Sequence, residues 1–422
     1  MIRERLERLM NSRFSRDTLW LIAAQAVLMI AGFGVNLVIG NLQGADALGV
    51  FNQALAFYTI LSTFFALGLN NTITKKIAEG QRSAEETQRI LVSNLFVTTL
   101  FSGMLSALVC LLAIQQPTLF SSSELARVVY IPMIALPFFN INKNFGAYFT
   151  GLRLQKRFAQ QRILRWTIII SFVSISVAWN NSIESALWCF FAAEFSLFIL
   201  NTFQLGRRIK LTIDKATIAE NLRFGMKTYA AELISVLNAS LDVILIGYFL
   251  TNAETGIYSF VVYFAKTLYI FPGIMMQNFS PIISKTWASG NRDELLTKMK
   301  SIKKINTLVV SLQLVALLIA YPLITMCVKK EFSGTFWLFS ITSLGAFIFS
   351  LIAWSGSMLI MTNNLNRNIQ RVAMIIIFSA VSSIVLTSLY GLPGACIGYC
   401  LNAIMSYAAT SQHIKLALNI RV

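Results

Sequence analysis

Apolar segments of about twenty residues recur along the whole of this chain, and they constrain its fold more than any other feature. An α-helix rises about 1.5 Å per residue, so about 20 apolar residues span the roughly 30 Å hydrocarbon core of a bilayer. The 422-residue chain is 56% hydrophobic and only 13% charged, whereas soluble domains have about 25% charged residues. We therefore predict an all-α polytopic membrane protein with about 12 transmembrane helices, at residues 18–41, 46–69, 88–114, 126–150, 162–180, 184–205, 228–250, 255–283, 303–328, 333–361, 370–390 and 392–416.

The net charge of +17 is divided unevenly between the predicted loops. Lys and Arg crowd the N-terminus and alternate loops, while the opposite loops hold only Arg127, Lys329 and Lys330. Because loops rich in Lys and Arg stay on the cytoplasmic side, we predict that both termini are cytoplasmic and that the N-terminal segment is retained. This distribution indicates a membrane, and no nucleic acid, as the partner of the basic residues.

The sequence lacks the parts that several chemistries need. It contains no G-x-x-x-x-G-K-[ST] loop for ATP, and its one histidine, His413, lies near the C-terminal tail. The five cysteines all fall in apolar segments, so neither a disulfide framework nor a metal site is predicted. We therefore expect a transporter, with no cofactor, and not an enzyme.

An internal repeat supports transport. Residues 35–58 can be laid on residues 242–265, which matches Gly40 with Gly247, Gly49 with Gly256, and Phe51 with Tyr258. Repeats about half a chain apart are typical of transporters with two halves. We predict two six-helix bundles around a central cavity, formed by residues 1–210 and 211–422.

The stretch from 242 to 295, "DVILIGYFLTNAETGIYSFVVYFAKTLYIFPGIMMQNFSPIISKTWASGNRDEL", resembles the seventh and eighth helices of Wzx-type polysaccharide flippases. These flippases belong to the multidrug/oligosaccharidyl-lipid/polysaccharide exporter superfamily. Two earlier stretches, "ADALGVF" and "LGLNNTITKKIAEG", fit the same pattern. The residues that carry the resemblance are Asp242, Ile246, Gly247, Gly256, Tyr258, Pro272 and Pro281.

The resemblance implies a function and a location. Such a flippase moves an undecaprenyl-pyrophosphate-linked oligosaccharide from the inner to the outer leaflet of the bacterial cytoplasmic (inner) membrane by alternating access. The product feeds a surface polymer such as the O-antigen of lipopolysaccharide. Implied partners are the lipid-linked oligosaccharide, the bilayer, and the polysaccharide polymerase with its chain-length machinery.

Two lysines fall inside predicted helices. Lys143 lies ten residues before Arg153, and Lys266 lies ten residues after Gly256, so each is about 15 Å from a helix end and near the middle of the bilayer. A charge at that depth costs about 2.5–3.5 kcal/mol on insertion scales. We predict that these two lysines, the only basic residues left at that depth by the topology, bind the pyrophosphate head group.

Polar neighbours accompany both lysines, and we predict that they line the cavity for the sugars. Asn140 and Asn144 share a helix face with Lys143, Tyr263 and Thr267 share one with Lys266, and Asn36 is polar in the first helix. The alternative interpretation is that either lysine simply pairs with Glu194, which is also predicted near mid-membrane.

Acidic residues in the predicted seventh helix allow two roles. Asp242 forms a polar stripe with Glu232, Ser235 and Asn238, and such a stripe faces the protein interior. Asp242, Glu232 and Glu194 either balance the cavity lysines or bind the proton or Na⁺ that drives transport. Related lipid II flippases draw acidic ion ligands from a late helix, but residues 370–416 contain no Asp or Glu.

Two other functional classes remain. An ion-coupled exporter of drugs or small cations shares the predicted fold, although such an exporter favours an acidic cavity. A membrane scaffold for glycan assembly needs no polar interior. The two lysines favour the flippase over both.

Overall fold

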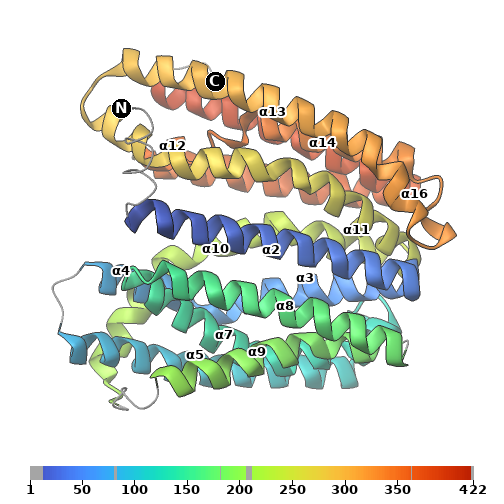
Figure 1. Ribbon diagram of the computed structural model, residues 1–422, viewed down its shortest axis with the longest axis horizontal. Helices are drawn as coiled ribbons and strands as arrows, with labels where there is room; N and C mark the ends of the chain where they lie inside the picture. The colour runs from blue at the N-terminus through green and yellow to red at the C-terminus, as the bar shows by residue number, and fades with distance from the viewer. Residues whose placement is uncertain (1–12, 80–82, 181, 206–211, 363, 420–422) are drawn as a thin grey trace. The chain divides into compact units, whose positions relative to one another are not determined.

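The computed structural model describes residues 13–79, 83–180, 182–205, 212–362 and 364–419. Within these ranges all regular secondary structure is helical (Figure 1). Nine helical stretches of the described chain are long and apolar enough to cross a membrane. The prediction of an all-α polytopic membrane protein is therefore confirmed. The two ends of the chain lie outside the described residues, so their cytoplasmic location stays a prediction.

The twelve predicted segments all coincide with helical structure, but not with one helix each. The last two both lie in α16 (Leu365–Leu418), which Gly391 divides through a φ of 62°. The fourth lies mainly in α7 (Tyr130–Gly151), which contains three asparagines and a lysine and is not among the nine stretches. The seventh lies in α10 (Lys215–Phe249), where the described side chains include the apolar stretch Ala239–Phe249.

The first of two compact units comprises Met1–Gln43 and Gln53–Val236. Its central helix is α7, which packs against helices from before and after it in the chain, as Figure 1 shows for its neighbours α5, α8 and α9. This arrangement buries Asn140, Asn142 and Asn144 of α7 within the unit. The helices of this unit, besides α7 and the first part of α10, are α2 (Arg13–Leu42), most of α3 (Ala45–Ala66), α4 (Leu69–Ala78), α5 (Ala84–Gln115), α6 (Ser123–Val128), α8 (Gln155–Asn180) and α9 (Ile183–Leu205).

The second unit comprises Gly44–Asn52 and Leu237–Val422. Its central helix is α14 (Phe336–Ala353), which packs against α11, α12, α13 and α16. Part of its core is built by Phe279, Trp354 and Met358, all of which are buried. The remaining helices are α11 (Asn252–Lys266), α12 (Ile270–Ala288), α13 (Arg292–Met326) and α15 (Met358–Met361), with short 3₁₀ turns at Pro117–Leu119, Thr267–Tyr269 and Lys330–Phe332.

The helix α10 belongs to both units, to the first as far as Val236 and to the second from Leu237. Its early turns are held to α4 by an ion pair of 2.7 Å between Lys76 and Glu220 and by a cation–π contact of Lys75 with Phe224. The predicted division at residue 210 and the central cavity stay predictions.

Residues 44–52 belong to the second unit because α3 and α11 cross there at a pair of glycines. A Cβ atom on Gly49 would lie 1.9 Å from the carbonyl oxygen of Asn252, and one on Gly256 would lie 1.9 Å from that of Ala45. No side chain fits at either position. This close approach gives a physical reason for the match between Gly49 and Gly256 in the internal repeat.

These two repeat-related helices begin differently. At α11, the side chain of Thr251 accepts a bond from the N–H of Glu254, whose carboxylate accepts one from the N–H of Thr251. At α3, the N–H of Ala45 donates to the carboxylate of Glu331, 2.6 Å away and 286 positions along the chain. The local sequence therefore fixes the start of α11, whereas tertiary contact fixes that of α3.

Candidate functional site

The helix α10 carries both acidic residues that approach the two predicted lysines. Its first turn is capped by Asp214, whose carboxylate accepts bonds from the N–H and the hydroxyl of Thr217. These bonds hold the pKa of Asp214 below its usual range. Farther along, Glu232 and Asp242 lie ten residues apart, which is about 15 Å of helix. Of the predicted stripe, Ser235 and Asn238 have side chains outside what the structure describes.

Lys143 forms an ion pair with Glu232 inside the first unit. The Nζ of Lys143 lies 2.6 Å from Oε1 of Glu232. Both side chains are partly accessible, at 21% and 23% of their surface. A lysine on α7 is thus joined to α10, in a contact short enough for a charge-assisted hydrogen bond.

Two asparagines of α4 donate to the same carboxylate. The Nδ2 of Asn71 lies 2.8 Å from Oε2 of Glu232, and the Nδ2 of Asn70 lies 3.5 Å from both oxygens. They are brought there by the turn between α3 and α4, where Leu67 and Gly68 have φ of 50° and 67°. Sequence reasoning missed both asparagines, although they lie in the quoted "LGLNNTITKK"; the pair of amides after a glycine was the available signal.

Lys266 forms a looser pair with Asp242 in the second unit. The Nζ of Lys266 lies 3.6 Å from Oδ2 of Asp242 and donates to the carbonyl oxygen of Ala239 at 3.0 Å. The hydroxyl of Tyr258 donates to the same Oδ2 at 3.2 Å. Lys266 is the last residue of α11, where the chain tightens into a 3₁₀ turn.

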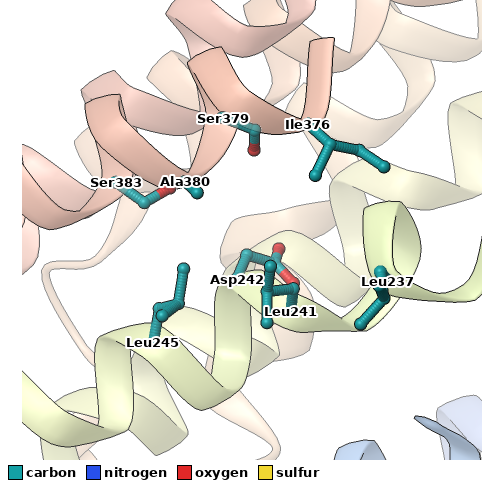
Figure 2. A pocket seen from close by; sticks show the side chains of 8 residues that line it. All are labelled: Leu237, Leu241, Asp242, Leu245, Ile376, Ser379, Ala380 and Ser383. Carbon is teal, nitrogen blue, oxygen red and sulfur yellow. The ribbon is translucent and has the colours of Figure 1, made fainter. Parts of the chain in front are cut away.

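A small cavity lies beside Asp242 in the second unit. It has a volume of about 10 Å³, roughly the space of one water-sized probe. Figure 2 shows Asp242 among leucines of α10, with Ser379 and Ser383 of α16 across the cavity. Leu237, Leu241, Leu245, Ile376 and Ala380 complete the lining. One carboxylate and two hydroxyls make a polar spot in an otherwise apolar wall.

Glu194 is bound by Arg165, while Lys143 lies against Glu232. The alternative interpretation therefore names the wrong partner for Lys143. The Oε1 of Glu194 lies 2.6 Å from Nε of Arg165, and its Oε2 accepts a bond of 3.0 Å from the same guanidinium. Asn142 donates to Oε2 at 2.9 Å and accepts a bond from Asn201 at 3.0 Å. With only 2% of its side chain exposed, Glu194 is enclosed among Arg165 and Asn142.

A third basic residue, Arg165, lies in the predicted helix 162–180, which the structure begins earlier, as α8 at Gln155. The depth of Lys143 and Lys266 in the bilayer stays a prediction. Arg165 therefore lies about 15 Å along the helix, close to the ring of Phe139, whose centroid is 4.8 Å from its guanidinium carbon. The helix starts early because its polar first turns, rich in Gln, Lys and Arg, are good helix formers.

The other predicted lining residues make mostly local contacts. Asn144 donates to the hydroxyl of Thr98 at 2.9 Å, Asn36 to the carbonyl of Gly32 at 2.8 Å, and Thr267 to that of Phe264 at 2.6 Å. Asn140 is buried and Tyr263 is half-buried. Their predicted role as a sugar-binding lining stays a prediction.

A protein family described as "Polysaccharide biosynthesis protein" matches residues 14–287 of this chain. This range contains Lys143, Glu232, Asp242 and Lys266. Stage V sporulation protein B of Bacillus subtilis (strain 168) is 24% identical over 311 residues, which are 67% of this chain and 60% of that protein. The chain thus spans less than two thirds of that relative.

Solved structures of transporters share the fold. The inward closed conformation of the lipid II flippase MurJ matches with a TM-score of 0.77 at 15% identity, covering 94% of this chain and 87% of that one. An inward-facing multidrug resistance transporter of the MATE family and MOP superfamily also gives 0.77, at 12% identity over 92% of this chain and 94% of that one. At such identities the likeness shows the fold alone.

Proposed function

Because the chain belongs to the polysaccharide biosynthesis protein family, we propose that it is a flippase for an undecaprenyl-pyrophosphate-linked oligosaccharide. It moves this lipid from the cytoplasmic to the outer leaflet of a bacterial cytoplasmic membrane, for the assembly of a surface polysaccharide of the O-antigen type. The family match agrees with the resemblance to polysaccharide flippases found in the sequence. The polymerase and chain-length machinery are the expected downstream partners.

The observation that carries the proposal is the pair of lysines inside helical units. Lys143 and Lys266 are each partly accessible, at 21% and 32% of their side chains, and each lies beside an acid of α10. Placing a lysine within a membrane segment is costly, and an acid that is itself accessible lowers that cost while leaving the ammonium within reach of another anion. Pyrophosphate needs such cations because stripping water from an anion in a medium of low dielectric constant is expensive.

For Asp242 we propose the role of counter-charge to Lys266. The ammonium 3.6 Å away and the Tyr258 hydroxyl 3.2 Å away supply positive charge and a hydrogen bond to its Oδ2. Ser379 and Ser383 add neutral hydroxyls to the wall of the adjacent cavity. Asp242→Asn is then expected to lower the amount of folded protein but to preserve transport per molecule. Loss of the response to a proton or Na⁺ gradient at normal abundance would instead establish ion coupling.

The direct test is a chromosomal deletion followed by analysis of undecaprenyl-linked intermediates. The deletion strain should accumulate the oligosaccharide on the cytoplasmic side, and the wild-type gene should clear it. Lys143→Ala and Lys266→Ala should each reduce clearance at least tenfold, with Arg partly restoring it because it keeps the charge but changes the donor geometry.

The matched control is Lys298→Ala, which removes one lysine from an exposed pair with Glu294 and should clear normally. If the double Ala variant clears normally at normal abundance, the lysines do not handle the head group. If the deletion strain accumulates no lipid-linked glycan but loses drug efflux, the multidrug exporter with the same fold is the function.

A further inference from the structure

The carboxylate of Glu232 occupies a small cradle of hydrogen-bond donors that suits a larger anion. Lys143 supplies an ammonium at 2.6 Å and Asn71 an amide N–H at 2.8 Å. The amide of Asn70 adds a weaker contact at 3.5 Å. The donors come from α7 and α4, while the acceptor comes from α10. The donors of the cradle are therefore supplied by two helices, and the carboxylate that occupies it comes from a third.

We propose that this cradle is the phosphate-binding site and that Glu232 is a tethered competitor which the phosphate displaces from Lys143. The inference rests on the proposed function only for the source of the phosphate, which is the pyrophosphate of a lipid-linked sugar. The pyrophosphate of such a lipid is esterified at both ends, so each of its two phosphoryl groups carries one negative charge, and together they present four terminal acceptor oxygens. The pyrophosphate can engage one ammonium and two amides together more fully than a singly charged carboxylate can.

The accessibility of Lys143 and Glu232 indicates that the bound carboxylate can be exchanged for another anion. The side chains of Lys143 and Glu232 keep 21% and 23% of their surface accessible, so an incoming anion can reach both. The contrast within the same unit is Glu194, which has 2% exposed and is bound by Arg165 in two places and by Asn142. Glu194 is enclosed, whereas the side chain of Glu232 keeps 23% of its surface accessible and has room to move away from Lys143.

A tethered competitor gives selectivity. A weakly binding anion with a single charge gains no more from Lys143 than Glu232 already does, and so it does not displace the carboxylate. Pyrophosphate binds the cradle more strongly than the carboxylate does because it carries more negative charge and more acceptor oxygens. When it binds, Glu232 loses its partners on α4 and α7 together, while the ion pair of Lys76 with Glu220 still holds the early turns of α10 to α4. Substrate binding is thereby coupled to the release of the part of α10 that carries Glu232.

The test is calorimetric titration of inorganic pyrophosphate into the purified full-length protein and its variants. Glu232→Gln removes the competing charge and should bind pyrophosphate at least tenfold tighter than the wild type. Adding Lys143→Gln to that variant should abolish the gain. Glu232→Asp keeps the charge on a shorter side chain, should give an intermediate affinity, and tests the idea even if the Gln variant does not fold.

The matched control is Glu220→Gln, which removes a carboxylate from the same helix and leaves Lys76 without its partner at 2.7 Å. It changes the net charge equally and should alter pyrophosphate affinity less than twofold. Equal gains in both Gln variants, or no gain in Glu232→Gln, overturn the tethered competitor. A tenfold gain in a protein whose deletion traps no lipid-linked glycan overturns the proposed function alone.

Discussion

The polar cluster around Glu194 and the pair between Lys143 and Glu232 lie in the same unit, yet they use charge in opposite ways. Glu194 has four hydrogen-bonding or ionic contacts to Arg165 and Asn142 and is 2% exposed. Glu232 has one strong ionic contact, one good amide bond and a quarter of its surface accessible. The first arrangement is suited to holding α7, α8 and α9 in register. The second is suited to exchange.

The pair between Lys266 and Asp242 extends the comparison to the second unit. Here the lysine donates to a main-chain carbonyl at 3.0 Å, and the carboxylate lies 3.6 Å away. The acid in turn accepts a bond from Tyr258. Lys266 and Asp242 are thus each held partly by a third group. The loss of one of them should therefore affect the other less than the loss of Lys143 affects Glu232. We expect the strength of coupling to fall from Arg165–Glu194 to Lys143–Glu232 to Lys266–Asp242.

The largest expected loss in the free energy of unfolding follows from breaking the Arg165–Glu194 pair. Arg165→Met leaves a buried carboxylate without a cation, and breaking a buried pair in this way costs about 3–5 kcal/mol. The free energy of unfolding in detergent, from denaturant titration, measures the loss. A loss below about 1 kcal/mol would remove the distinction between a structural and an exchangeable pair.

A smaller effect is expected for Lys143→Met. Its partner Glu232 keeps the bond from Asn71 and partial access to solvent, so the loss should be about 1.5–3 kcal/mol, the usual range for a hydrogen bond to a charged group. A double-mutant cycle with Glu232→Gln isolates the coupling between the two side chains. Additive losses would show that the contact at 2.6 Å contributes nothing to stability.

The smallest effect is expected for Lys266→Met. Its side chain is 32% accessible and its carboxylate partner lies 3.6 Å away, so the loss in the free energy of unfolding should be about 0.2–1 kcal/mol, the usual range for an accessible ion pair. In a cycle with Asp242→Asn the coupling should fall below that of Lys143 with Glu232. A larger coupling in the second unit would reverse the order and make Asp242 the tighter partner.

The sequence predicted the helical segments well because their signal is local. Twenty consecutive apolar residues have few alternatives to a membrane helix, and the division of α16 at Gly391 was visible as the break between two predicted segments. The matched glycines, Gly49 and Gly256, were found as a repeat before their contact was known. The lysines and acids were found because charge is rare in apolar segments.

The pairing of those charges was beyond the sequence. The sequence offered Glu194 as an alternative partner of the lysines because all three residues are predicted near mid-membrane, but in the structure Arg165 of α8 binds Glu194. Asn70 and Asn71 were missed because their amides reach Glu232 only through the direction that the turn at Leu67 and Gly68 gives to α4. The sequence pattern alone does not predict that direction.

By itself the sequence determined that this chain is a bundle of membrane helices with two internal lysines and a glycine-matched repeat. The helices can be predicted because each apolar segment satisfies its own backbone hydrogen bonds in a membrane. The lysines and the glycines can be read directly from the sequence. Only the tertiary structure decided that α10 presents Glu232 to Lys143 and Asp242 to Lys266, while Arg165 takes Glu194. The physical reason is that an ion pair depends on side-chain positions to within about 1 Å, and those positions are set by how whole helices pack and not by the residues next to each charge.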